Sequence, residues 1–272
     1  MHQDLSHILR AAPQGGGRFV LQVPDGWQQD RGAYGGLTLG ALARAVIDCA
    51  AEPERALRSL TGVLAAPVQT GPAEIEVQLL RRGSAVSTYT AALRQGGAEV
   101  LAHVTVVLGR TRPAAAGLVD HRFQPQAPER PAFESLPALP IRPPFGPPFA
   151  QHFEYRSAQP PPFLGLSPEP VCGGWLRPRT PPAVLEAPEL IALADVWWPA
   201  IYAMESAPRP GGTVSFTAEV FPPQRPLDKA RPFYHSARAH SAGDGFILEH
   251  RDLWSEDGQL LVHNPQTFAL IK

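Results

Sequence analysis

Residues 32–51 read GAYGGLTLGALARAVIDCAA, a glycine-rich turn that opens an apolar segment, and this stretch decides the fold. From Leu37 onward, apolar residues recur at helical spacing (Leu39, Leu42, Ala43, Val46 and Ile47), which predicts an amphipathic helix over 37–51. A short strand is predicted before it, over 18–22, and four strands after it, over 59–66, 73–81, 86–94 and 100–108. Several of these alternate polar and apolar residues, which is typical of half-buried antiparallel strands.

The second half of the chain repeats this order of elements. A strand is predicted to end over 174–177, a helix over 187–204, and strands over 213–220, 233–240, 246–254 and 260–270. The last hairpins correspond closely, because Glu99-Val100-Leu101-Ala102-His103 matches Gln259-Leu260-Leu261-Val262-His263. A duplicated unit of one helix and one antiparallel sheet explains both halves, and the helix buries one face of each sheet. The predicted fold class is therefore α+β.

A proline-rich stretch separates the two halves. Ten prolines fall between Pro113 and Pro148, and they include Pro143-Pro144-Phe145-Gly146-Pro147-Pro148. Proline removes backbone donors and fixes φ, so neither a helix nor a central strand can run through this region. The predicted organisation is a first repeat over 1–110, a semi-rigid connector over 111–149 and a second repeat over 150–272.

Composition excludes several classes of function. The 272 residues carry 24 basic and 25 acidic side chains, which leaves no electrostatic footprint for a nucleic-acid partner. Two cysteines make no disulfide framework, and nine histidines show no metal-ligand spacing, so we expect neither a metal nor a cofactor. The N-terminus lacks a signal-peptide pattern, and no stretch reaches the length of about 18 apolar residues that a membrane span requires. These features predict a cytoplasmic protein without membrane insertion.

Asp195 is the most informative single residue. Its neighbours at helical spacing are Ile191, Ala192, Trp198 and Pro199, all apolar, which predicts that Asp195 lies on the buried face of its helix. Burying a carboxylate without partners costs several kcal/mol, so polar groups must compensate. Either a structural hydrogen bond, such as a capped backbone group, or a catalytic role would explain it.

Four further stretches match a known family. They are Gly35-Gly36 at the helix start, Arg58-Ser59-Leu60-Thr61, Gly71-Pro72, and the run from Leu80 to Thr88, LRRGSAVST. Together with positions in the second half, they resemble the acyl-CoA thioesterase II (TesB-like) family over most of the chain except the connector. This resemblance implies a double hotdog fold, in which two curled antiparallel sheets each wrap a long central helix. It also implies acyl-CoA as the partner and fatty acid metabolism as the setting, and it allows a homodimer.

In that family an Asp, a Thr and a Gln of the second repeat activate water. The matching positions are Asp195, Thr213 after Gly211-Gly212, and Gln266, eight residues after Gly258. A carboxylate accepts a proton from water, while a hydroxyl and an amide hold that water for attack. The tetrahedral oxyanion then needs donors, and Gly35 and Gly36 are the candidates, because the first N–H groups of a helix are free. A tight turn and close packing of the helix on the sheet would explain these two glycines equally well.

The chain also departs from the family pattern. Ser215-Phe216 stands where the closest members have Asp-His, and Gln266-Thr267-Phe268 replaces Gln-Glu-Gly. Aligning the repeats puts Val106 opposite Gln266, Arg58 opposite Thr213 and Gly40 near Asp195, so the first half lacks all three polar groups.

Three functions remain open. The first is hydrolysis of acyl-CoA to a free acid and CoA. A hotdog-type hydratase is the second, although the Asp and His that such enzymes place on one motif are absent near Asp195. The third is a non-catalytic acyl-CoA binding or sensing protein.

Overall fold

The computed structural model describes residues 4–112, 123, 125–165 and 167–270. The helices are α1 (Leu5–Ile8), α2 (Gly35–Ala50) and α3 (Ala187–Ala194), with 3₁₀ turns η1 (Phe133–Ser135), η2 (Pro148–His152) and η3 (Ala200–Ala203). The strands are β1 (Ala12–Gly15), β2 (Arg18–Val23), β3 (Gln28–Gln29), β4 (Gly32–Ala33), β5 (Arg55–Leu64), β6 (Gly71–Arg82), β7 (Val86–Arg94), β8 (Ala102–Arg110), β9 (Phe153–Ser157), β10 (Val171–Pro178), β11 (Gly211–Val220), β12 (Phe233–Gly243), β13 (Phe246–Trp254) and β14 (Leu260–Leu270).

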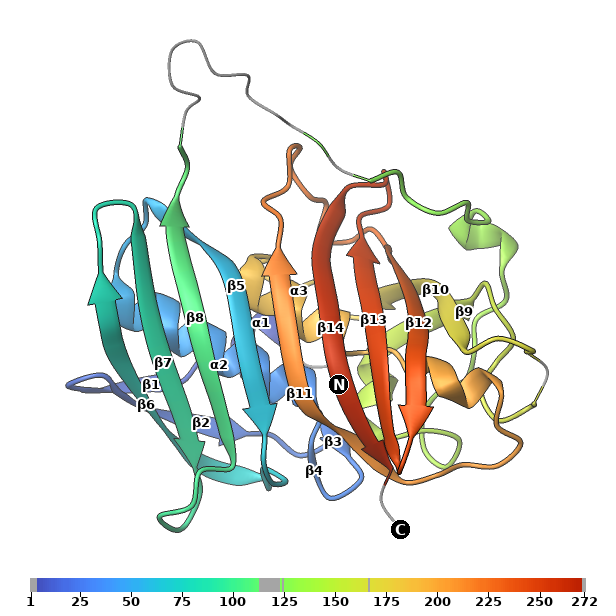
Figure 1. The fold of residues 1–272 in the computed structure, drawn as a ribbon, viewed down its shortest axis with the longest axis horizontal. Helices are drawn as coiled ribbons and strands as arrows, with labels where there is room; N and C mark the ends of the chain where they lie inside the picture. Colours follow the sequence, from blue (N-terminus) through green and yellow to red (C-terminus); the bar gives the residue numbers. More distant parts are fainter. Residues whose placement is uncertain (1–3, 113–122, 124, 166, 271–272) are drawn as a thin grey trace.

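One curved antiparallel sheet runs through both halves of the molecule (Figure 1). Its strand order is β1-β2-β6-β7-β8-β5-β11-β14-β13-β12-β10-β9, and β3 and β4 form a separate pair. The halves join where β5 pairs with β11, with Thr61 opposite Thr217. We call this β5–β11 junction the seam. Because the seam is a continuous ladder of strands, the two repeats share one sheet.

Helices α2 and α3 lie on the same face of this sheet and run in opposite directions across the seam (Figure 1). Gly36 lies close to the carbonyl of Ala192, and Gly40 close to the carbonyl of Pro188, such that a Cβ would lie 2.6 and 2.9 Å from these oxygens. Glycine therefore allows the two helices to pack at short range. Their apolar faces share one continuous hydrophobic core with the sheet.

The second helix is shorter than the sequence pattern predicts. The helix expected over 187–204 ends at Ala194, and the chain then turns before η3. Pro199 prevents the helix from continuing to 204, since it carries no backbone N–H and disfavours the helical conformation at Trp198, although α3 already ends four residues before Trp198. The prediction of a long central helix in each repeat is therefore not confirmed for the second repeat, while α2 extends over 16 residues.

The strand pattern is predicted well in the middle of the sheet and poorly at its edges. The ranges expected for 86–94, 246–254 and 260–270 coincide with β7, β13 and β14. The pattern does not predict β1 or β9, the outermost strands, nor the short pair β3 and β4.

The connector predicted over 111–149 lies in part outside the described residues. Its end packs on the first half, because the ring of Phe149 stacks on Tyr34 at 4.5 Å, and just after the connector the ring of His152 stacks on Trp27 at 4.1 Å. These contacts hold the turn that precedes α2. None of the helices in the described ranges combines the length and apolar character of a membrane span.

Candidate active site

Asp195 stands where α3 stops. Its backbone, with φ −100° and ψ 4°, leaves the helical conformation, and its N–H bonds to the carbonyls of Ala192 and Leu193. The residue is only 6% exposed. The predicted burial is confirmed, although the neighbours expected at plus three and plus four lie beyond the end of the helix.

The carboxylate of Asp195 meets the N-terminus of α2 from the other half. The N–H of Gly36 hydrogen-bonds to it, and a Cβ on Gly35 would lie 2.7 Å from Oδ2. Tyr34, the N-cap residue of α2, supplies no side-chain cap. Asp195 thus takes the capping position across the seam, where the helix dipole favours a negative charge. The two glycines expected as oxyanion donors lie against the expected base, and one of their N–H groups already serves it.

The pKa of the Asp195 carboxyl is raised toward neutral pH. Burial raises the pKa of its carboxyl to about 6, while Arg251 and the Gly36 N–H act in the opposite direction. A carboxylate with a pKa near the working pH is suited to act as a general base.

A buried ion pair supports this carboxylate from β13. Arg251 Nη1 lies 3.4 Å from Asp195 Oδ1 and donates to the carbonyl of Trp197 at 3.1 Å. Arg251 Nε donates to Glu249 Oε1 at 2.5 Å, and both side chains are at most 2% exposed. Burial lowers the pKa of Arg251, but Glu249 and Asp195 outweigh it and the net shift is upward. The guanidinium is therefore a permanent cation among two carboxylates.

Gln266 and Thr213 complete the cluster. The amide of Gln266, 2% exposed on β14, is oriented so that its nitrogen donates to Thr213 Oγ1 at 3.1 Å. Its oxygen accepts from Arg251 Nη2 at 2.7 Å. The structure thus brings Asp195, Thr213 and Gln266 into one network, with Arg251 joining the first to the third.

A β-bulge gives Thr213 its orientation. Phe216 is buried on the inner face of β11, so strict alternation would turn Thr213 outward. The register with β14 shifts between Thr213 and Ser215, which adds one residue and brings Thr213 to the same side as Gln266.

A cavity of about 240 Å³ opens beside the cluster and is bounded by both halves. Its walls include Gly35 and Thr38 of α2, the segment from Leu64 to Val68, and Gly211 to Val214. Thr213 and Gly35 line the cavity, whereas Asp195 and Gln266 lie behind them. Access to the Asp195 carboxylate therefore passes the bare backbone of Gly35.

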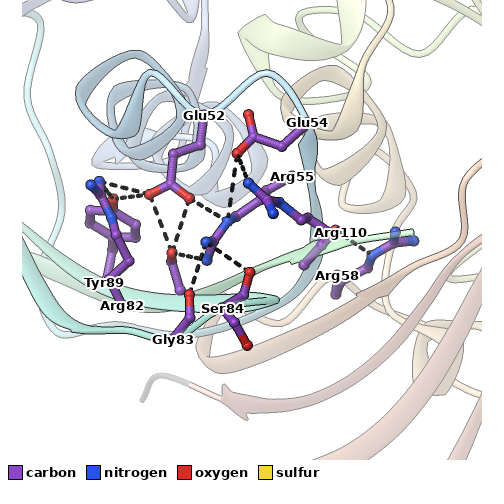
Figure 2. A network of polar contacts seen from close by, with 11 residues as sticks. Glu52, Glu54, Arg55, Arg58, Arg82, Gly83, Ser84, Tyr89 and Arg110 are labelled. Carbon is purple, nitrogen blue, oxygen red and sulfur yellow. Dashed lines mark hydrogen bonds and ion pairs between the residues drawn. The ribbon is translucent and has the colours of Figure 1, made fainter. Parts of the chain in front are cut away.

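The first half carries a different carboxylate at the end of its helix (Figure 2). Glu52, just after α2, accepts from Tyr89 at 2.8 Å and Ser87 at 3.0 Å, and it pairs with Arg55 at 2.6 Å and Arg82 at 2.8 Å. Burial acts to raise its pKa, but these partners lower it below the ordinary value. Helices α2 and α3 are thus each followed by an acid, and of these two acids only Asp195 has a pKa raised toward neutral pH.

The strand registers correct the alignment of the two repeats by one residue. β5 has a bulge between Leu57 and Ser59 that corresponds to the one in β11, so Leu57, and not Arg58, occupies the position of Thr213. Val106 pairs with Leu60 as Gln266 pairs with Phe216, which retains the correspondence of Val106 with Gln266. The first half therefore has apolar residues in place of both polar groups.

Glu249 and Arg251 are not among the site residues predicted from the sequence. Both side chains lie on the buried face of β13, as do those of Ile247 and Leu253 on either side. The side chains of His250 and Asp252 lie on the other face. Two charges at alternate positions of a buried strand face are rare unless paired. That pattern was available in the sequence.

The departures from the family pattern border the polar cluster without joining its hydrogen bonds, since Phe216 lies opposite Gln266 and Phe268 opposite Thr213. Phe216 is 1% exposed and belongs to the hydrophobic core. Ser215 and Thr267 face each other across β11 and β14. In the described ranges, no group of three His, Cys, Asp or Glu side chains could hold a metal ion.

Comparison with solved structures identifies the fold as a hot dog fold. A conserved protein of unknown function from Alicyclobacillus acidocaldarius, described as having this fold, has a TM-score of 0.84 and 24% identity, with 98% of each chain covered. A tesB protein of Mycobacterium avium subsp. paratuberculosis has a TM-score of 0.79 and 18% identity, again with 98% of each chain covered. An acyl-CoA thioesterase II, TesB2, of Mycobacterium marinum has a TM-score of 0.75 and 17% identity over 98% of each chain.

Family models make the assignment more specific. The acyl-CoA thioesterase N-terminal domain matches residues 23–109, and the acyl-CoA thioesterase C-terminal domain matches residues 119–270. The chain belongs to the acyl-CoA thioesterase family and is a thioesterase, as the sequence resemblance predicts. No curated protein matches it in sequence.

Proposed function

We propose that this thioesterase hydrolyses acyl-CoA to a free acid and CoA with water activated at Asp195, in a site completed by Thr213 and Gln266. The observation that carries the proposal is the Asp195 carboxyl, buried behind a cavity and with a pKa of about 6. Such a group is ionised at neutral pH and still basic enough to accept a proton. Glu52, the acid that follows the helix of the first half, lacks this property.

The reaction follows from these positions. Asp195 takes a proton from water as the water oxygen attacks the thioester carbonyl, and the resulting oxyanion lies near the N-terminus of α2. Gly35 and Gly36 are the proposed donors there, with Gly35 the better placed because the Gly36 N–H already binds Asp195. Collapse of the intermediate breaks the C–S bond, and the proton returns from Asp195 to the thiolate. The products are the acid and CoA thiol.

The direct test measures thiol release from a panel of short, medium, long and aromatic acyl-CoAs. We expect turnover of at least one member without added metal, since the proposed steps use only side chains and backbone groups of this chain. Binding of every member without thiol release would instead support the acyl-CoA sensing function. Consumption of an enoyl-CoA without thiol release would support the hydratase.

The pH dependence gives a second prediction. Because Asp195 must be ionised to accept a proton, kcat/KM is expected to rise with pH, to reach half its plateau near pH 6 and to level off about one pH unit above that. One pH unit below that pKa, about a tenth of the carboxyls are ionised, so activity falls to about a tenth of its plateau. A profile that is flat from pH 4.5 to 8 would contradict Asp195 as the base.

A further inference from the structure

The hydrogen bonds between Arg251, Gln266 and Thr213 have a defined direction. A guanidinium carries only donors, and three nitrogens of Arg251 lie within 2.5–3.2 Å of one terminal atom of the Gln266 amide. That atom is therefore the amide oxygen. In the opposite orientation the amide nitrogen would face these donors and gain only a 3.5 Å contact with Glu249 Oε1.

This direction determines what Thr213 can do. The other terminal atom of the amide is then the nitrogen, a donor, and it lies 3.1 Å from Thr213 Oγ1. The hydroxyl oxygen accepts that bond, so its own proton is free to point elsewhere. Thr213 lines the cavity, whereas Gln266 and Arg251 do not. The hydroxyl can therefore present a proton donor to a molecule in the cavity.

Resting on the proposed hydrolase function, we propose that Thr213 donates a hydrogen bond to the thioester oxygen as it becomes an oxyanion, and that Gln266 and Arg251 are positioning residues that impose this direction. Asp195 and Thr213 then have separate tasks. The first accepts the proton of water, and the second stabilises the charge that develops on the carbonyl oxygen. The amide oxygen of Gln266 is occupied by Arg251 and does not hold the water.

Glu249 keeps the cation in place. Its Oε1 accepts from Arg251 Nε at 2.5 Å, and its Oε2 accepts from the backbone N–H of Ala200 at 2.5 Å. Arg251 is thereby tied to the segment that follows α3, and the carbonyl of Trp197 fixes a second nitrogen. A guanidinium held at both ends cannot rotate away from Gln266, so the direction of the hydrogen bonds is built into the fold.

Gln266→Glu tests the direction, because it preserves size while replacing the amide donor with an acceptor. One carboxylate oxygen still accepts from Arg251, and the other now accepts the Thr213 proton, which turns the hydroxyl away from the cavity. We expect kcat on the best acyl-CoA of the panel to fall about 100-fold, the effect of losing one oxyanion donor, with KM nearly unchanged. Rates are compared on the plateau of each pH profile, since the added charge also raises the pKa of Asp195.

Variants of Thr213 complete the test. Thr213→Ser retains the hydroxyl and is expected to keep most of the activity, while Thr213→Val loses kcat about as much as Gln266→Glu. The double variant should be no slower than Thr213→Val alone, because both changes remove the same donor. Fully additive losses, or a Thr213→Val enzyme with normal kcat, would overturn the inference even if the wild type hydrolyses acyl-CoA. If Gln266→Glu does not fold, the comparison of serine with valine still decides.

Discussion

Replacing Asp195 with asparagine is expected to lower kcat/KM for acyl-CoA hydrolysis by about 10²- to 10⁴-fold, the contribution of a positioned general base. Asparagine fills the same space and keeps an oxygen that can accept from the Gly36 N–H. It cannot take a proton from water. Thiol release, measured with the best acyl-CoA of the panel, checks the loss. Activity within fivefold of wild type would show that another group is the base.

The same variant should not lose stability. The folded pKa of Asp195, about 6, lies above its ordinary value of 3.8, so the ionised carboxyl disfavours the folded state. This contribution lowers stability as pH rises through that window, and above pH 6 it amounts to about 3 kcal/mol. Asparagine removes the cost, while Glu249 still pairs with Arg251. We expect the melting temperature at pH 7.5 to be equal to or above that of the wild type.

Glu52→Gln is the matched control, since it neutralises the acid at the end of the other helix. The pKa of Glu52 is lowered in the folded state, so its charge stabilises the protein above pH 4.5 and this stabilisation is lost on acidification. Removing it should cost about 1–3 kcal/mol through the weakened bonds to Tyr89 and Arg55. We expect kcat/KM to stay within twofold. The two variants would thus differ, because the loss of Asp195 affects activity and the loss of Glu52 affects stability.

Gly35→Ala is the second change with a large expected effect. Its methyl group would lie 2.7 Å from Asp195 Oδ2 and 2.8 Å from Leu64 Cδ1, at the point where the cavity reaches the carboxylate. We expect kcat/KM to fall at least about tenfold, because small displacements of reacting groups lower the rates of enzymes by such factors. Alanine is otherwise the better helix former by up to about 1 kcal/mol, so low helix propensity would not explain a loss.

Gly212→Ala provides the comparison for this experiment. Gly212 lines the same cavity, but a Cβ there has no neighbour within 4 Å. Its kcat/KM should stay within twofold of wild type. Equal losses in both alanine variants would point to the cavity as a whole, and no loss in Gly35→Ala would mean that substrate reaches Asp195 by another route.

The sequence predicts the repeated order of elements because hydrophobic periodicity is local information. It also predicts the burial of Asp195, although the helix predicted over 187–204 ends at Ala194, one residue before Asp195. Pro199 rules out a continuous helix to 204, but the pattern of apolar residues does not predict a stop as early as Ala194. Of the two edge strands, β1 is short and has no buried residue, and β9 alternates apolar and polar residues over only five positions, which is too short to stand out in the sequence.

The arrangement of the site is less accessible to sequence, because it depends on contacts across the seam. That the carboxylate of Asp195 caps α2 follows from how two helices pack, and no local pattern contains it. The inward turn of Thr213 requires a bulge whose position strict alternation does not predict. The alternation along β13 predicts that Glu249 and Arg251 are charged residues on a buried face, but it does not predict which groups they pair with.

Because Asp195 caps α2 across the seam, each repeat depends on the other. The fusion of both repeats in one chain makes this dependence possible. One repeat supplies a helix without a side-chain cap, and the other supplies the anion that completes it. Because both are on one chain, they always meet in equal numbers and at high effective concentration. Each repeat was then free to specialise, one as the donor of an electropositive helix end and the other as the carrier of reactive side chains. Two separate identical subunits could not divide the labour in this manner.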